Sequence, residues 1–197
     1  GDVSDTRFPR WSTVRYDFPK RGELAPISVF WHEGSKPNTD GSYKDSKGNP
    51  TKTRPHHPAV FEEIERLDPE LARRRRNAAT VYVGDKGIIV CGSHGGGPVL
   101  LPASRREEFT PPPARLPRPQ GGIMGDFLTA CHAGGGPTFS GFGTFSGPFM
   151  EMLLVGHLAM RAGLNRPVEW DGAAMKCTNR PELNQYVDWP YREGWSL

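Results

Sequence analysis

The segment from residue 146 to 163, SGPFMEMLLVGHLAMRAG, most constrains the fold of this 197-residue sequence. Ser146 can cap the start of a helix and Gly163 can end it. Because apolar residues occur nearly all round this helix, we expect other elements to cover both sides, with a β-sheet as the main cover. His157 lies inside the apolar run and is interpreted as a hydrogen-bonded core histidine. Six residues recur at helical spacing: Met150, Leu153, Leu154, His157, Leu158 and Arg161.

Alternating apolar and polar residues predict strands in the rest of the chain. Residues 11–18 and 27–32 alternate and are expected to form a hairpin. A second hairpin is predicted over residues 79–92, where two β-branched runs flank the turn sequence GDKG. Short strands are also predicted at residues 99–101 and 168–170. The two hairpins predict antiparallel pairing of their strands.

Helical spacing predicts helices between these strands. One covers residues 61–76 and is expected to bend or divide at Pro69. Shorter ones are predicted at residues 104–109 and 183–187, and one at 123–133 with Phe127, Leu128 and Cys131 directed inward. The predicted fold class is therefore α+β, a mainly antiparallel β-sheet with helices packed on one face.

The length predicts one domain, spanning residues 1–197. The chain holds 24 Gly and 20 Pro, which indicates long irregular connections. We expect a long irregular insertion at about 33–77, since residues 33–58 are polar and show no periodicity. Such a segment is either a functional surface loop or a disordered insertion. A Pro-rich connector is predicted at 110–120.

Charge and hydropathy argue against two classes of partner. The 25 basic and 22 acidic residues give a net charge of +3, without the clustered excess of a nucleic-acid-binding protein. The run Arg73–Arg76 would point in every direction from a helix, which is typical of a solvated surface. No run of about 18 apolar residues occurs and the first residues do not resemble a signal peptide, so we expect no membrane span. The protein is expected to be soluble, and the compartment, cytoplasmic or periplasmic, stays open.

Motifs for cofactors, metals and nucleophilic catalysis are lacking. The glycines of 92–97 and 141–147 do not match a dinucleotide or phosphate loop, and neither HExxH nor GxSxG occurs. Three widely spaced cysteines predict neither a disulfide framework nor a metal site. The candidate substrate-binding residues are Trp31 and His32, at the end of a strand, and His94, in a glycine-rich loop. Aromatic faces and polar tips of this kind suit sugar-like ligands.

Four segments carry a resemblance to a known family: VYVGDKGIIV, EMLLVGHLAMRAG, VEWDGAAMKCTNRPELNQY and YREGWSL. Together they resemble the C-terminal half of oxidoreductases of the glucose–fructose oxidoreductase/inositol dehydrogenase/MocA (Gfo/Idh/MocA) type, in particular a bacterial variant abundant in planctomycetes. FWHEGSKP is similar to a strand-then-loop segment of that group. The resemblance implies a two-part enzyme. Its N-terminal domain binds NAD or NADP, and its C-terminal domain supplies a large antiparallel sheet that walls the substrate site and forms a homo-oligomer.

The family's dinucleotide motif and the segment with its catalytic lysine are not found in this sequence. No catalytic or cofactor-binding residue is therefore assigned to the chain, which alone is expected to be inactive. The leading hypothesis is a substrate-binding and oligomerisation domain of an NAD(P)-dependent oxidoreductase acting on a sugar, polyol or glycoside. The alternative is a stand-alone carbohydrate-binding or assembly module without redox activity.

Overall fold

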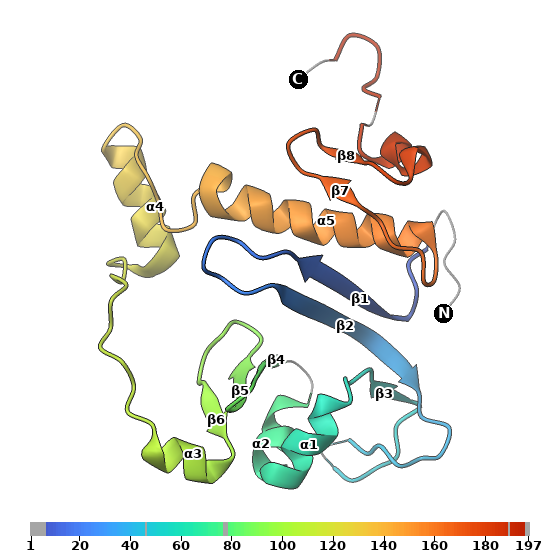
Figure 1. Ribbon diagram of the computed structural model, residues 1–197, viewed down its shortest axis with the longest axis vertical. Helices are drawn as coiled ribbons and strands as arrows, with labels where there is room; N and C mark the ends of the chain where they lie inside the picture. Colours follow the sequence, from blue (N-terminus) through green and yellow to red (C-terminus); the bar gives the residue numbers. More distant parts are fainter. Residues whose placement is uncertain (1–6, 46, 77–78, 189, 196–197) are drawn as a thin grey trace. The chain divides into compact units, whose positions relative to one another are not determined.

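The computed structural model describes residues 7–45, 47–76, 79–188 and 190–195 (Figure 1). The chain, expected to form one domain, forms two compact units. The first unit comprises Arg10–Thr13 and Trp31–Pro113. The second comprises residues 7–9, 14–30 and the described residues from 114 onward. Strands β1 (Trp11–Phe18) and β2 (Ile27–Pro37) contribute residues to both units.

The fold class is α+β with antiparallel sheets and several helices, which confirms the prediction at this level. The described strands form three small sheets, in the orders β1-β2-β3, β4-β5-β6 and β7-β8, whereas the resemblance implies one large sheet. The alternation predicted for residues 11–18 is confirmed in β1, where Val14 is buried and its neighbours in sequence, Thr13 and Arg15, are exposed. No helix among the described residues has the length and apolar character needed to cross a membrane.

Residues 33–77 contain more regular structure than the expected irregular insertion; residues 46 and 77 of this stretch lie outside the described residues. Strand β2 continues to Pro37 and pairs with β3 (Thr53–Pro55). The connection between them is held by Asn38, whose side-chain amide donates to the carbonyl oxygens of Tyr43 and Thr51 at 2.9 and 2.8 Å. Side-chain to backbone bonds of this kind order a polar loop without producing any hydrophobic period, so the periodicity of the sequence did not reveal them.

Helices α1 (Val60–Leu67) and α2 (Pro69–Arg75) follow, separated as predicted at Pro69. Asp68 accepts a hydrogen bond from the Leu71 backbone at 2.9 Å and so caps α2, while Pro69 occupies its first turn. The predicted second hairpin is confirmed as β4 (Ala79–Gly84) and β5 (Gly87–Gly92), and β6 (Val99–Leu101) pairs with β5. These elements enclose the core of the first unit: Phe61, Ile64, Leu71, Ala72, Ile88, Val90 and Leu101.

The first unit ends after α3 (Ala103–Glu108), and residues 110–119 contain no helix or strand. In the second unit, α4 (Gly122–His132) precedes a π-helical turn, η1 (Phe142–Ser146), and the long helix α5 (Gly147–Ala162). Strands β7 (Trp170–Asp171) and β8 (Lys176–Cys177) and the 3₁₀-helix η2 (Pro181–Tyr186) complete it. Its core is small and consists of Leu158, Cys177 and Leu183 with partly buried neighbours.

Three predictions about these helices are wrong, two on burial and one on capping. Phe127 and Leu128 of α4 were expected to face inward, but 48% and 51% of their surfaces are exposed, and Cys131 is exposed too. Among the described residues of α5, only Gly156 and Leu158 are fully buried. Ser146 does not cap α5, because its hydroxyl donates to the Ser140 carbonyl oxygen instead. Periodicity identifies an apolar face, but it does not supply the partner that covers that face.

Candidate functional site

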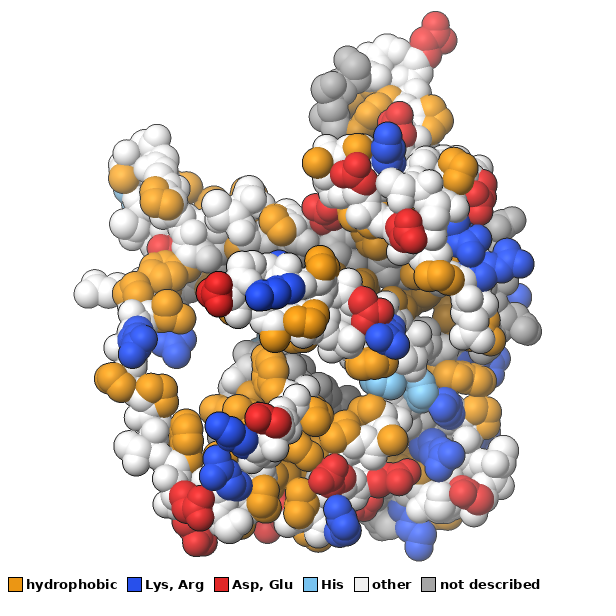
Figure 2. Space-filling view, in the orientation of Figure 1, with side chains coloured by type: hydrophobic (Ala, Val, Ile, Leu, Met, Phe, Trp, Pro, Cys, Tyr) orange, Lys and Arg blue, Asp and Glu red, His pale blue; other side chains and the backbone are white. Residues whose placement is uncertain are grey.

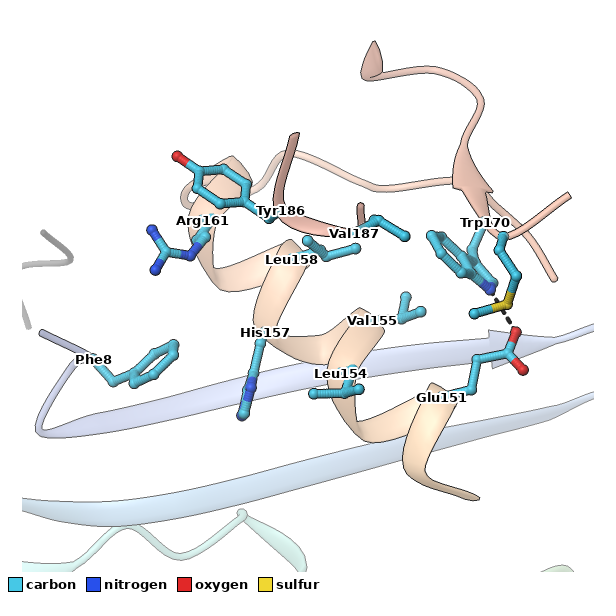
Figure 3. A pocket seen from close by; sticks show the side chains of 11 residues that line it. Phe8, Glu151, Leu154, Val155, His157, Leu158, Arg161, Trp170, Tyr186 and Val187 are labelled. Carbon is cyan, nitrogen blue, oxygen red and sulfur yellow. Dashed lines mark hydrogen bonds between the residues drawn. The ribbon is translucent and has the colours of Figure 1, made fainter. Parts of the chain in front are cut away.

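A cavity of about 360 Å³ lies in the second unit, between α5, β7 and η2 (Figure 3). Its lining combines aliphatic side chains with aromatic and charged ones. Ligand sites commonly combine such an apolar lining with a few polar groups that fix orientation. The lining residues on α5 are Glu151, Leu154, Val155, His157, Leu158 and Arg161, and the others are Phe8, Trp170, Met175, Tyr186 and Val187.

Trp170 and Glu151 form one end of this cavity. The Trp170 indole Nε1–H donates to Glu151 Oε1 at 2.7 Å, as Figure 3 shows with a dashed line. A tryptophan with its N–H bonded presents a large, rigid apolar face. An ionised carboxylate accepts several hydrogen bonds, so Glu151 can also accept from ligand hydroxyls. This pair can therefore bind the C–H face and the hydroxyl groups of one ligand.

Cationic and aromatic groups lie elsewhere around the same cavity. The Arg161 guanidinium lies over the Tyr186 ring, 4.4 Å from its centroid, which fixes the side chain while leaving its donors available. The His157 ring is tilted against Phe8, with centroids 4.9 Å apart. His157 is exposed, so its interpretation as a core histidine is wrong. Figure 3 shows the Arg161–Tyr186 pair and the Phe8–His157 pair away from Trp170 and Glu151.

The sequence places these groups together through helical spacing. One face of α5 carries Glu151 and, three, four and seven residues later, Leu154, Val155 and Leu158. Sequence reasoning missed Glu151 and Trp170 because they are 19 residues apart on different elements. The signal that could have indicated a cavity is that the apolar face of α5 carries a charged residue at each end, Glu151 and Arg161.

The three predicted substrate-binding residues lie in the first unit, and none of them lines this cavity. Trp31 is 40% exposed, and it precedes His32 on β2, so the two side chains point to opposite faces of the strand. His94 lies on the β5–β6 connection, where its Nδ1 hydrogen bonds with Ser93 Oγ at 3.0 Å. Their contact with a substrate stays a prediction.

The structure brings His32 together with His56, which sequence reasoning did not select. Thr13 Oγ1 lies 3.0 Å from His32 Nδ1 and 2.8 Å from His56 Nε2. The two rings meet edge to face with centroids 5.3 Å apart. A hydroxyl has one proton, so Thr13 can donate to one ring and accept from the other when both histidines are neutral. Burial lowers the pKa of His32 and of His56, and the nearby positive charge of Lys36 lowers both further.

The lowered pKa values of His32 and His56 predict that the stability of the first unit depends on pH. Their folded-state pKa values lie below the ordinary value of 6.5, so the unfolded chain binds more protons around and below that pH. The free energy of unfolding should therefore fall as pH falls below about 6.5. Urea unfolding of the first unit at pH 7.5 and 5.5 measures the change. The acid loss should be smaller in His56→Gln, whose amide keeps hydrogen-bonding groups without titrating; an undiminished loss would contradict this assignment.

The described residues contain no group of three or more His, Cys, Asp or Glu side chains that could hold a metal ion. Comparison of the sequence and structure with protein-family models, curated proteins and solved structures finds no match.

Proposed function

We propose that this chain is the substrate-binding and oligomerisation domain of an NAD(P)-dependent oxidoreductase acting on a sugar, polyol or glycoside. The observation that carries the proposal is the cavity of the second unit, where the hydrogen-bonded pair Trp170 and Glu151 lines the space together with apolar side chains. NAD or NADP would be bound by a separate domain of the Gfo/Idh/MocA type and would supply the hydride transfer. This chain would orient the hydroxyl-bearing substrate and exclude water from it.

The ligand class follows from the groups around the cavity. A sugar presents both a C–H face and a ring of hydroxyls, and it carries no charge that needs a counter-ion. The Trp170 ring offers an apolar face for the C–H groups. Glu151 accepts from hydroxyls, whereas Arg161 and His157 can donate to hydroxyl or ether oxygens. The cavity volume of about 360 Å³ falls at the lower end of the range for small-ligand sites.

Exposed apolar side chains support association with another protein surface. In the second unit, Ile123 and Met124 of α4 are 70% and 69% exposed, and Phe142 of η1 is 81% exposed. A contiguous apolar patch of several hundred Å² is typical of an interface. The resemblance implies a homo-oligomer formed through the sheet; we propose that the domain associates with copies of itself and that these exposed side chains of α4 and η1 take part in the contact.

A stand-alone carbohydrate-binding module is the second candidate, because all eleven residues that line the cavity belong to one unit of this chain. Both candidates predict sugar binding, but only the oxidoreductase requires a separate cofactor-binding domain. Sugar binding that depends on an added cofactor domain favours the oxidoreductase. The module is favoured if the chain alone binds sugar with full affinity and no bound sugar is oxidised or reduced when NAD(P) and that domain are supplied.

The proposal also predicts that this chain alone does not bind the cofactor. An NADH titration followed by nicotinamide fluorescence should therefore show no saturable binding.

Replacement of Trp170 tests the ligand site. We expect the wild-type chain to bind a panel of monosaccharides and polyols, measured by calorimetry, and Trp170→Ala to weaken the best ligand at least tenfold, about 1.4 kcal/mol. Part of this loss comes from the stacking face and part from Glu151, which loses its indole donor. Trp31→Ala is the matched control, because Trp31 does not line the cavity. A loss confined to Trp31→Ala would instead assign the ligand to the strand-end site predicted from the sequence.

A further inference from the structure

A second pocket, of about 320 Å³, lies in the first unit and is built around two cations that face each other. Lys36 on β2 and Arg54 on β3 both line it, and they are direct partners in the antiparallel register of these strands. Side chains directly opposite each other have Cβ atoms about 5 Å apart, and like charges at such positions destabilise the strand pair. The sheet therefore holds two positive charges at the pocket at an electrostatic cost.

No carboxylate of the described chain forms an ion pair with either cation. The ion pairs between described residues join other side chains. Glu62 and Glu65 of α1 line the same pocket without reaching ion-pair distance of these cations. Hydrogen bonds from Ser42 lower the pKa of Asp40, and the charge of Arg54 lowers it further. Neither cation is held in an ion pair, so both keep their donors for another group.

Two histidines also line this pocket. His56 and His57 line it next to the two cations, and Figure 2 shows histidine side chains beside Lys and Arg over the region of β3. His57 Nε2 forms a hydrogen bond with the Arg76 carbonyl oxygen. His56 Nδ1 is buried without a hydrogen-bond partner in the described part of the chain. A buried polar atom without a partner requires an explanation, and an unfilled ligand site beside it is one.

We propose that this pocket binds a small phosphomonoester of a polyhydroxy compound, with the phosphate held between Lys36 and Arg54. A phosphate offers oxygens in several directions, so the guanidinium and the ammonium can each contact it from their own strand. Glu62 and Glu65 are three residues apart and share a face of α1, where they can accept from the ligand's hydroxyls. The volume suits a ligand of this size. The site lies in the other unit from the cavity around Trp170 and does not depend on the function proposed for it.

The test is binding of glycerol phosphate to the full chain, measured by calorimetry at fixed ionic strength. We expect saturable binding, and at least a tenfold loss of affinity in Lys36→Gln and in Arg54→Gln. Lys86→Gln removes the same charge from the β4–β5 turn of the same unit, and should bind within twofold of wild type. Arg54→Lys keeps the charge and should retain more affinity than Arg54→Gln. Equal losses in Lys36→Gln and Lys86→Gln would show a general charge effect and overturn the proposal.

Two further readouts separate the parts of the site. Glycerol without phosphate should not bind, and inorganic phosphate should bind more weakly than glycerol phosphate; equal affinity would overturn the role given to Glu62 and Glu65. In NMR titrations, added glycerol phosphate should raise the pKa of His56, because the bound dianion opposes the charge of Lys36. An unchanged His56 titration at saturating ligand would place the ligand elsewhere and overturn the proposal. Circular dichroism of each variant confirms that it folds.

Discussion

Gly34→Ala should lower the free energy of unfolding of the first unit by about 3 kcal/mol, from left-handed backbone strain and steric overlap together. Gly34 has a φ of +79°, a region that residues with a Cβ rarely adopt. A Cβ at this position would overlap the carbonyl oxygen of Arg10 and lie 2.7 Å from the Trp11 Cα. Both obstacles are backbone atoms at the start of β1, so no side-chain rotation relieves them.

Hydrogen exchange locates the expected damage. The Ser35 amide donates to the Arg10 carbonyl oxygen and the His56 amide donates to the Gly34 carbonyl oxygen, each at 3.1 Å. Moving Gly34 away from Arg10 should weaken both bonds, so these two amides should lose protection first. Since β2 lies between β1 and β3, the effect should reach both neighbouring strands.

Gly41→Ala is the matched control for this substitution. Gly41 has a similar φ of +65° in the same unit, but a Cβ there would meet nothing within 4 Å. The control should therefore cost only the backbone strain, about 1 kcal/mol. Equal losses in the two variants would show that the contact with Arg10 contributes nothing, and would contradict the close approach of Gly34 to β1.

Local signals in the sequence were sufficient for most elements. Pro69 cannot continue a helix, and its ring ends α1 and begins α2 where predicted. The turn between Gly84 and Gly87 closes the β4–β5 hairpin at the predicted position. Each of these features depends on a few residues that are adjacent in the chain, so tertiary contacts do not change them.

Features that depend on distant residues were not predicted. The Trp170–Glu151 bond and the contacts of Thr13 with His32 and His56 join residues between 19 and 43 positions apart. The local sequence does not indicate such pairs, because each of these residue types is common in the helix or strand that carries it. The exposure of α4 and α5 was not predicted either. The apolar pattern of each helix is clear in the sequence, but we expected other elements of the same chain to bury it, and they do not.

Ile64→Ala should lower the free energy of unfolding of the first unit by about 2 to 5 kcal/mol. Ile64 has no exposed surface and lies where α1 meets α2 and the β4–β5–β6 sheet, so its removal leaves a cavity that several elements would have to fill. Ile64→Val removes a single methylene group and should cost about 0.5 to 1.5 kcal/mol. Urea unfolding monitored by circular dichroism measures this series.

Leu67→Ala distinguishes burial from helix propensity, because it deletes a similar side chain from the same helix. Leu67 is 37% exposed at the end of α1, and water can occupy the space that its side chain leaves. We expect a loss of less than about 1 kcal/mol, the range of partly exposed positions away from special features. Equal losses in Leu67→Ala and Ile64→Ala would mean that α1 packs on the core through a different face from the one in the structure. The position of β3 and of the Lys36–Arg54 pocket beside α1 would then be wrong as well.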